Sequence, residues 1–386
     1  MDAARLSRGR VSGLAVVEQA RTRSRATLGA SFAVRAAFIW PALLAILFVS
    51  IYPLLVSLYI SLSHLKLVRG GFRFRFVGLD NYRDLFVGDE RAHFLGVTRP
   101  PTPLGWLVFG AGLALLAWEL YRAWRGGASA PGMALRVLGA LVAAAALWLL
   151  VGTLLSAGGR PGTAVVTAVY VLVGIAAQFL LGLGLAYLLT QGLPGQRFFR
   201  VVFLLPLTIT PVGVAYMFRM LTDTGKGPLH PLWAAVGLSD FSWVNDPWGA
   251  RVAVMVGDIW QWTPFMFIIL LAALEGQDQD TVEAGMVDGA SRWQIFRHIS
   301  LPAILPVCTT VILIRLIEAF KIIDLPNVLT NGGPGTATES LSLQAYIRWR
   351  ALDLGQSAAV AYSLLFIVTV VALSYVNLVR RRLAEA

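Results

Sequence analysis

Residues 283–302 read Glu-Ala-Gly-Met-Val-Asp-Gly-Ala-Ser-Arg-Trp-Gln-Ile-Phe-Arg-His-Ile-Ser-Leu-Pro, a polar and helix-favouring stretch within a very hydrophobic chain. Long apolar segments flank it on both sides, at 251–274 and 303–325. Each flanking segment can supply the about 20 apolar residues that a helix needs to cross a membrane. The stretch therefore predicts a water-exposed connection between two membrane-spanning helices.

The composition of the whole chain favours a polytopic membrane protein. Of its 386 residues, 57% are hydrophobic and only 14% are charged, and the mean hydropathy is +0.70, which is more apolar than a water-soluble domain requires. The net charge of +11 does not indicate nucleic acid, because the arginines gather at the N-terminus and beside apolar segments. One cysteine, Cys308, and four scattered histidines predict neither a disulfide framework nor a metal site.

Eight apolar segments predict eight transmembrane helices and an all-α fold. They cover 38–62, 104–121, 135–156, 163–190, 198–221, 251–274, 303–325 and 357–379. The pair at 104–121 and 135–156 is nearly free of polar groups, and we interpret it as an inserted hairpin. The expected organisation is a basic cytoplasmic tail at 1–34, a first helix with an outer segment at 35–103, the inserted hairpin at 104–157, and the main transmembrane domain at 158–386.

Basic residues predict the orientation of these helices. Both ends of the chain are rich in arginine, and an even number of spans places them on one side, which the positive-inside rule assigns to the cytoplasm. The outer connections are then 63–103, 157–162, 222–250 and 326–356, whereas 279–302 faces the cytoplasm. The first outer segment agrees poorly with the rule, because it contains Lys66, Arg69, Arg73, Arg75, Arg83, Arg91 and Arg99.

Within 279–302, the residue types predict two short helical stretches joined by a glycine. Thr281 can cap the first helix, and Glu283 lies in its first turn, where the helix dipole favours an acid. Gly289 supplies a backbone that can turn and permit close approach. The second stretch, from Ser291 to His298, ends before Pro302, a residue suited to start the next helix. A second protein can come close to this loop at its small residues, Ala284, Gly285 and Ala290.

The spacing in this loop resembles the EAA loop of ABC-importer permeases, which docks on an ATPase. The family pattern is Glu-Ala-Ala, three residues, Gly, nine residues, Ile-x-Leu-Pro. This chain matches it at Glu283, Ala284, Gly289, Ile299, Leu301 and Pro302, and Asp288 and Ala290 flank the glycine. It departs at Gly285, where Gly replaces Ala and lowers the helix propensity by about 1 kcal/mol while staying small. A short rigid helix joined to spans at both ends can pass a movement to them.

Other segments are similar to carbohydrate-uptake permeases of the maltose and glycerol-phosphate type. They are Phe-Val-Gly-Leu-Asp-Asn-Tyr at 76–82, Phe-Leu-Leu-Pro at 203–206, and the stretches 318–324 and 329–335. The similarity covers 38–86 and 163–383, and the insertion 104–156 departs from the six-helix core of the family. The resemblance implies a multi-pass subunit of the bacterial inner membrane that imports a sugar or related carbohydrate. It also implies a second permease, a dimeric ATPase and an extracytoplasmic solute-binding protein as partners.

The sequence itself indicates that ATP is hydrolysed elsewhere. No Gly-x-x-x-x-Gly-Lys-[Ser/Thr] phosphate loop occurs, and the pair Gly225-Lys226 lacks the upstream glycine. We therefore expect no enzyme activity and no cofactor or metal in this chain, with ATP and Mg²⁺ bound by the partner ATPase. A two-fold ATPase presents two docking clefts, so a second EAA-like loop must come from another subunit. Family resemblance favours a heterodimer of permeases, and the sequence alone leaves a homodimer open.

Polar residues inside the predicted spans are the candidate solute contacts, because charges there are costly. Asp258, Trp260, Gln261 and Trp262 combine hydrogen-bonding groups with flat aromatic faces, which suits sugars. Glu318, Lys321 and Asp324 continue from Arg315 at three-residue spacing along one helical face. The alternatives are interfacial packing of the tryptophans and a ladder of ion pairs that positions the helix. The glycine-rich turn at 332–335 is either a docking point for a binding protein or a plain connection.

Two other classes of function stay open at this point. An ion-coupled secondary transporter could use Asp258 or Asp324, but it leaves the 279–302 loop unexplained. An integral membrane enzyme is disfavoured, because no metal cluster or nucleophile–base pair lies near a span end. A requirement for ATP and a separate ATPase separates the importer from the secondary transporter, and activity of the chain alone would indicate an enzyme.

Overall fold

A computed structural model describes residues 39–68, 71–127, 130–192 and 194–385, so the predicted basic tail at 1–34 lies outside the described residues. The chain forms two compact units, Met1–Ile60 and Ser61–Ala386. The described part of the first unit is an apolar helix, which covers Ile39–Ser61 and so ends at the unit boundary. It passes through a π turn, η1 (Leu47–Ile51), into α2 (Tyr52–Ser61).

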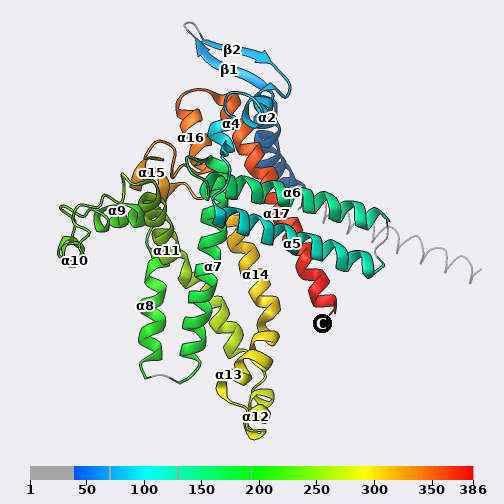
Figure 1. Cartoon of the computed structure of the whole chain (residues 1–386), viewed down its shortest axis with the longest axis vertical. Helices are drawn as coiled ribbons and strands as arrows, with labels where there is room; N and C mark the ends of the chain where they lie inside the picture. Colours follow the sequence, from blue (N-terminus) through cyan, green and yellow to red (C-terminus); the bar gives the residue numbers. More distant parts are fainter. Residues whose placement is uncertain (1–38, 69–70, 128–129, 193, 386) are drawn as a thin grey trace, which may run out of the picture. The chain divides into compact units, whose positions relative to one another are not determined.

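Helices dominate the second unit (Figure 1). The long ones are α5 (Pro103–Arg125), α6 (Ala130–Leu154), α7 (Thr163–Leu189), α11 (Pro247–Glu275), α14 (Leu301–Ala319) and α17 (Leu354–Glu385). The short ones are α3 (Asp80–Phe86), α4 (Arg91–Phe94), α8 (Gln196–Thr208), α9 (Pro211–Leu221), α10 (His230–Ala235), α12 (Gln279–Val287), α13 (Arg292–Ile295), η2 (Phe296–Ser300), α15 (Asp324–Thr330) and α16 (Leu341–Arg350). Together with the first helix, 7 helices of the described chain are long and apolar enough to cross a membrane, which confirms the predicted helical multi-span fold.

The predicted span at 198–221 is not one continuous helix. It consists of α8 and α9, whose axes meet at an angle of 98°. Pro211 has no N–H to continue the helix, and its ring forces the preceding Thr210 into an extended conformation, with ψ of 145°. Thr210 instead caps α9 by accepting a hydrogen bond from the backbone N–H of Gly213 at 3.3 Å. The pair counts as an eighth span only if the bend is part of a single crossing.

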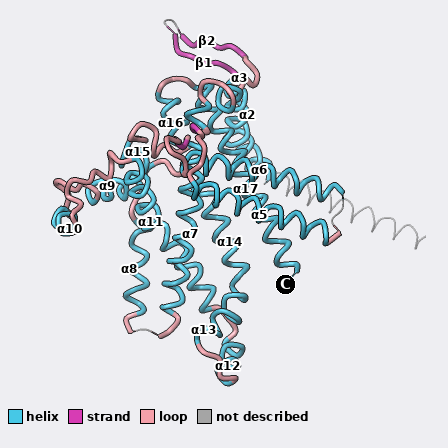
Figure 2. Tube along the Cα trace, viewed as in Figure 1, coloured by secondary structure: helices cyan, strands magenta, loops and turns pink. Residues whose placement is uncertain are grey.

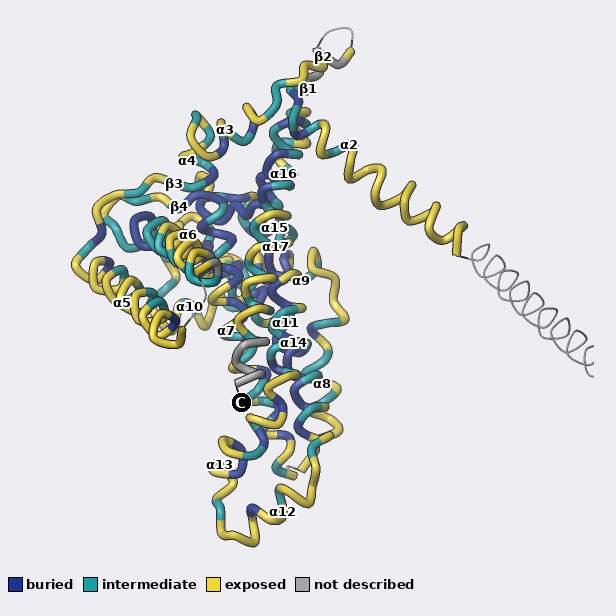
Figure 3. The backbone as a smooth tube through the Cα atoms, turned by 90° about the vertical axis from the view of Figure 1, so that its right-hand side faces the viewer, coloured by how far each residue is buried: buried dark blue, intermediate teal, exposed yellow. Residues whose placement is uncertain are grey.

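The core of the second unit is built from α7, α11 and α14, which lie side by side (Figures 1 and 3). Their buried residues form one apolar cluster that includes Ile175, Phe267, Leu271 and Val311. The helices α7 and α11 approach closely at Gly182, where a Cβ atom would lie 2.7 Å from the Cβ of Met266. Small residues at such contacts let membrane helices pack backbone against backbone.

The insertion forms an antiparallel pair of helices, α5 and α6, whose surface is mostly exposed (Figure 3). Its base is closed by two short antiparallel strands, β3 (Gly96–Val97) and β4 (Arg160–Pro161). Thr102 adds to this closure by donating from both its backbone N–H and its hydroxyl to the carbonyl of Leu155. In Figures 1 and 3, α5 and α6 run across the direction of α7.

Three of the predicted outer connections carry more structure than expected (Figure 2). The segment 63–103 contains an antiparallel ribbon of β1 (Ser63–Val68) and β2 (Gly71–Phe76), followed by α3 and α4. The segment 222–250 contains α10, and 326–356 contains most of α15 and all of α16. The last segment also contains a buried stretch, in which Thr338, Ser340 and Gln344 are each 0% exposed. These connections therefore contain folded segments that pack against helix ends.

Candidate coupling loop and solute path

The first half of the candidate coupling loop is the helix α12, which lies at one end of the core (Figure 1). Asp278 caps this helix, and its Oδ1 accepts a hydrogen bond from the backbone N–H of Asp280 at 3.2 Å. The hydroxyl of Thr281, the predicted cap, donates to Oδ2 of Asp278 at 3.1 Å. The predicted helix is confirmed, but it starts earlier than expected because aspartate is the stronger acceptor.

Gly289 ends α12 in the left-handed conformation, with φ of +79°. The backbone N–H of Ala290 then bonds to the carbonyl of Gly285 at 3.0 Å, which satisfies the end of the helix. A Cβ atom at Gly289 would meet nothing within 4 Å. The glycine is therefore required by backbone conformation in this chain, and steric closeness within the chain plays no part.

The second half of the loop runs without a break into a long helix. A capping box between Ser291 and Gln294 starts α13, and η2 links α13 to α14, so one helical path of 28 residues extends from Arg292 to Ala319. The predicted end of this stretch near 299–301 was wrong. Pro302 lies in the first turn of α14 and cannot donate a helical hydrogen bond, and the wider π turn η2 immediately before it carries the helix past that position.

The loop has an inner and an outer face. Gly285 is buried, and a Cβ there would lie 2.8 Å from Cδ1 of Ile299, so the departure from the family pattern accommodates an internal contact and does not create a docking surface. Glu283 and Ala284 are exposed. Next to them, Met286 is 55% and Val287 is 88% exposed, which is unusual for apolar residues in a polar loop.

A shallow pocket of about 360 Å³ lies between the two halves of the loop. It is lined by Asp288, Gly289, Ala290, Gln294, Ile295, His298 and Ile299. Leu301 is half-buried and Pro302 exposed at the start of α14. The predicted loop residues are thus brought together, with Gly285 and Ile299 on the inside and Glu283, Ala284 and Asp288 on the outside.

The candidate solute contacts separate into two groups, of which the first is a buried polar triangle. Arg315 of α14 donates to Oδ2 of Asp258 of α11 at 2.6 Å and to Oε1 of Gln178 of α7 at 2.8 Å. Gln178 in turn donates to the same carboxylate oxygen at 2.8 Å. Arg315 is 2% exposed and its guanidinium lies 4.6 Å from the ring centre of Trp262. Asp258 and Trp262 are therefore engaged by partners within the chain.

The second group lies beside the bend between α8 and α9. Gln261 is 4% exposed and donates from Nε2 to the carbonyl of Ile209 at 3.4 Å. Its Oε1 has no hydrogen-bond partner among the described residues. Trp260 packs edge-on against Phe218 of α9 and is 36% exposed. Of these two side chains, Trp260 keeps part of its ring exposed, whereas the unpartnered oxygen of Gln261 is buried.

The ladder of ion pairs, one of the two alternatives for the charges from Arg315 to Asp324, forms only in part. Only Lys321 and Glu318 pair within it, at 2.7 Å, and both side chains are largely exposed. α14 ends at Ala319, and Asp324 begins the separate helix α15. Arg315 turns inward to Asp258, a partner 57 positions away that three-residue spacing could not indicate.

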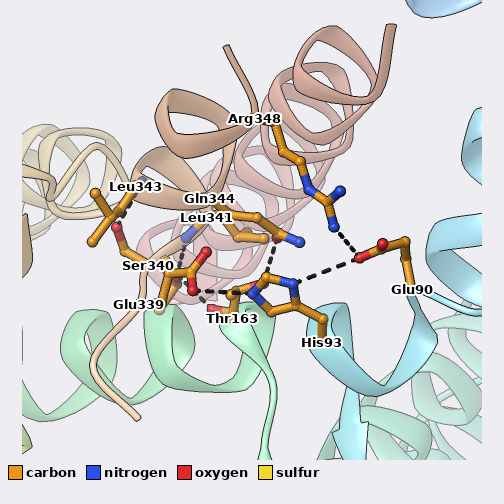
Figure 4. Close-up of polar contacts among 10 residues, drawn as sticks. Glu90, His93, Thr163, Glu339, Ser340, Leu341, Leu343, Gln344 and Arg348 are labelled. Atoms are coloured by element: carbon orange, nitrogen blue, oxygen red, sulfur yellow. Dashed lines mark hydrogen bonds and ion pairs between the residues drawn. The ribbon is translucent and has the colours of Figure 1, made fainter. Parts of the chain in front are cut away.

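A polar cluster at the opposite end of the core was not foreseen from the sequence (Figure 4). Nε2 of His93 lies 3.0 Å from Oε2 of Glu339, whose side chain is 5% exposed, and Nδ1 of His93 lies 3.6 Å from Glu90. Arg348 also pairs with Glu90. The hydrogen bond to Glu339 raises the pKa of His93 above its ordinary value of 6.5, against the opposing effect of burial. The sequence signal that could have indicated this cluster was Glu339, an acidic residue within a stretch of otherwise small residues.

These features define a multi-pass membrane protein in which a polar, exposed helix at one end is joined directly to the spans of the core. A family model described as "Binding-protein-dependent transport system inner membrane component" matches residues 178–384. The match covers more than half of the chain and includes the loop and the polar triangle, and the chain belongs to this family of transport permeases.

Relatives and solved structures agree with this assignment. The chain is 33% identical over 213 residues to the trehalose/maltose transport system permease protein MalF of Thermococcus litoralis, covering 55% of this chain and 72% of the relative. It is 30% identical over 214 residues to the trehalose transport system permease protein SugA of Mycobacterium tuberculosis, covering 55% and 68%. A bacterial ABC transporter involved in the import of the acidic polysaccharide alginate shares the fold, with a TM-score of 0.51, 19% identity, and coverage of 69% of this chain and 98% of that chain.

Proposed function

We propose that this permease is one subunit of an ATP-driven importer of a sugar or related carbohydrate and that a separate ATPase docks on α12. The observation that carries the proposal is the exposure of Met286 and Val287 next to Glu283 on a helix with rigid connections. Exposed apolar residues in a polar setting are typical of a surface that another protein covers. The trehalose and maltose permeases among the relatives support a carbohydrate as the solute.

The proposed mechanism is mechanical coupling through two helices. α12 is joined to α11 by the short connection 276–278 and to α14 by the uninterrupted path from Arg292. A displacement of α12 by a closing ATPase would therefore reach α11 and α14, two of the three helices that hold the polar triangle. Such coupling needs an element with two positions, and a rigid helix gripped by a cleft is one. ATP and Mg²⁺ would be bound by that ATPase.

The remaining partners and the orientation follow from the same proposal. The loop 279–302 and both termini would face the cytoplasm, and the chain would lie in the bacterial inner membrane. A second permease, in a heterodimer, would supply the second coupling loop. A periplasmic solute-binding protein would deliver the carbohydrate to the end that carries α15 and α16.

For the solute path we propose the neighbourhood of the bend between α8 and α9. The buried, unpartnered Oε1 of Gln261 would accept a hydrogen bond from a hydroxyl once the bend between α8 and α9 opens, and the exposed part of Trp260 can cover an apolar sugar face. Glu318 and Lys321 are exposed and stay candidates, together with Asp324. Asp258 and Trp262 would contribute by shaping the path through the triangle, because Arg315 binds the Asp258 carboxylate and covers the ring of Trp262.

Substitutions at Gly289 test the coupling proposal. Valine at a φ of +79° is strained, whereas asparagine is tolerated in the left-handed region. We expect Gly289→Val to leave membrane insertion intact and to lower the co-purification of an ATP-hydrolysing subunit and the uptake of labelled maltose or trehalose at least about tenfold. Gly289→Asn should retain most of both. Unchanged association and unchanged uptake in Gly289→Val would contradict coupling through this loop.

A further inference from the structure

The ribbon of β1 and β2 has one basic face and one apolar face. The register pairs His64 with Arg75 and Lys66 with Arg73, so these four positions share a face. The other face carries Leu65 opposite Phe74 and Ser63 opposite Phe76. Phe74 is 45% and Phe76 is 57% exposed, and Arg73 and Arg75 are exposed as well.

Water alone stabilises such a ribbon poorly, because its charges repel each other and its apolar side chains are exposed. Arg73 and Arg75 lie two positions apart on β2, so their cationic side chains share one face and repel each other. No ion pair in the described part of the chain joins an acid to Arg73 or Arg75. A two-stranded ribbon alone is also marginally stable. An anionic surface against the ribbon would relieve the charge repulsion and an apolar layer would cover the phenylalanines.

The root of the ribbon lies where membrane-spanning helices end. The carbonyl oxygen of Ser63 approaches Gly355 so closely that a Cβ at Gly355 would lie 2.2 Å from it. Gly355 is the second residue of α17, and the apolar candidate span of that helix starts at Leu354. Along the chain, Ser63 also follows the first candidate span by only two residues, because that span ends at Ser61. The ribbon therefore starts at the level of the lipid headgroups.

We propose that the β1–β2 ribbon is an interfacial anchor that binds an anionic lipid surface. The apolar face enters the boundary of the acyl chains, and the arginines reach the phosphate groups, as in amphipathic segments with basic polar faces. This role also accounts for the basic residues of 63–103 that fit the positive-inside rule poorly. Those on the ribbon would be held by lipid phosphates on the side of the membrane opposite α12.

Depth measurements on the full-length protein test the anchor. Cys308 is the one cysteine of the chain, so a Cys308→Ala background allows a single nitroxide label at Phe74→Cys or Arg75→Cys. The protein is placed in nanodiscs of phosphatidylglycerol and phosphatidylcholine, and collisions with oxygen and with a water-soluble nickel chelate are compared. We expect the label at 74 to collide mainly with oxygen and the label at 75 mainly with nickel. The expected contrast is larger in the phosphatidylglycerol discs.

Charge variants separate lipid binding from a general effect of basic residues. Arg73→Ser with Arg75→Ser should lower the ratio of lipid-embedded to water-exposed label at position 74 by roughly an order of magnitude in anionic discs. The matched control is Arg83→Ser with Arg91→Ser, two exposed arginines of the same segment outside the ribbon, which should leave the ratio unchanged. Equal nickel access at 74 and 75 in both lipids would overturn the proposal. Protection that appears only when a protein partner is added would overturn it too and would identify a protein-docking ribbon.

Discussion

The helices α7 and α6 have the same mean hydropathy, 2.3 over their most apolar windows, yet they differ in how much of their surface packs within the chain. In α7, 39% of the window is buried within the chain, against 17% in α6. α7 carries Gln178, which joins the polar triangle, and Gly182, which admits α11. α6 has no hydrogen bond of that kind to a core helix among the described residues, and it packs mainly on α5. Hydropathy thus predicts immersion in lipid, whereas small and polar residues within a span predict which helices pack together.

Removing the guanidinium of Arg315 should cause the largest loss of stability, because it disrupts the contact that distinguishes the packed core helices. Arg315→Met keeps much of the side-chain volume but leaves the buried carboxylate of Asp258 without its cation. We expect a loss of about 3 kcal/mol in the free energy of unfolding of the detergent-purified protein, measured by denaturant titration. Arg219→Met is the matched control, since Arg219 is exposed and donates to a single carbonyl, and it should cost about 0.5 kcal/mol.

The double variant Arg315→Met with Asp258→Asn shows whether the charge itself is responsible. Neutralising the acid removes the uncompensated charge, so most of the lost stability should return. A single variant as stable as the natural protein would show that the triangle does not hold the three core helices together.

Adding a methyl group to a glycine should have opposite effects in α7, at its contact with α11, and in α6. Gly182→Ala places a Cβ 2.7 Å from Met266 and 2.9 Å from the backbone nitrogen of Phe267, so α7 and α11 must move apart, at a cost of about 2 kcal/mol. Gly184 and Gly139 have nothing within 4 Å of an added Cβ. Alanine at either position should be neutral or stabilise its helix by up to about 1 kcal/mol. Thermal inactivation of the three variants in parallel would reveal this difference in sign, and equal loss in all three would contradict it.

Local patterns in the sequence predicted most of the spans and the first helix of the 279–302 loop. Runs of about 20 apolar residues are sufficient to recognise a spanning helix, and the spacing from Glu283 to Pro302 located the exposed helix at the correct place. The bend after Ile209 also had a local signal, because Thr-Ile-Thr-Pro precedes it. So did the ribbon, where Phe and Arg alternate after a glycine pair. These two features were predictable but were hidden by the apolar and basic composition around them.

Partners that are distant in the chain were not predictable in this way. The three-residue spacing of charges suggested that Arg315 pairs along its own helix, yet its partners Asp258 and Gln178 belong to two other helices. Glu339 is likewise neutralised by His93, 246 positions away. Which carboxylate a buried base meets depends on how the helices pack, and a single sequence does not contain that information in local form.

The pair of His93 and Glu339 lies where the insertion leaves the core, and its strength should depend on pH. Because the pKa of His93 is raised in the folded protein, its contribution to stability is full below the ordinary value of 6.5 and is lost as the pH rises through the raised pKa. We expect the free energy of unfolding of the natural protein to exceed that of His93→Gln by about 1 kcal/mol at pH 5.5 and to equal it at pH 8.5, measured by thermal unfolding. His298→Gln, at an exposed position in the coupling loop, serves as the control, and a difference independent of pH would exclude the charged pair as its cause.

Deleting the insertion should have the smallest effect and is the most direct test of the contrast between the packed and unpacked helices. Val97 and Arg160 are neighbours across the β3–β4 ladder, so their Cα atoms are only about 5 Å apart. Replacing 98–159 by Asn-Gly would close this ladder as a two-residue hairpin. Since α5 and α6 pack chiefly on each other, we expect the core to unfold within about 1 kcal/mol of the full-length chain and to keep its sensitivity to Arg315→Met. If the shortened chain instead fails to insert or loses the effect of Arg315→Met, then the two apolar helices stabilise the core through contacts that hydropathy and packing both fail to reveal.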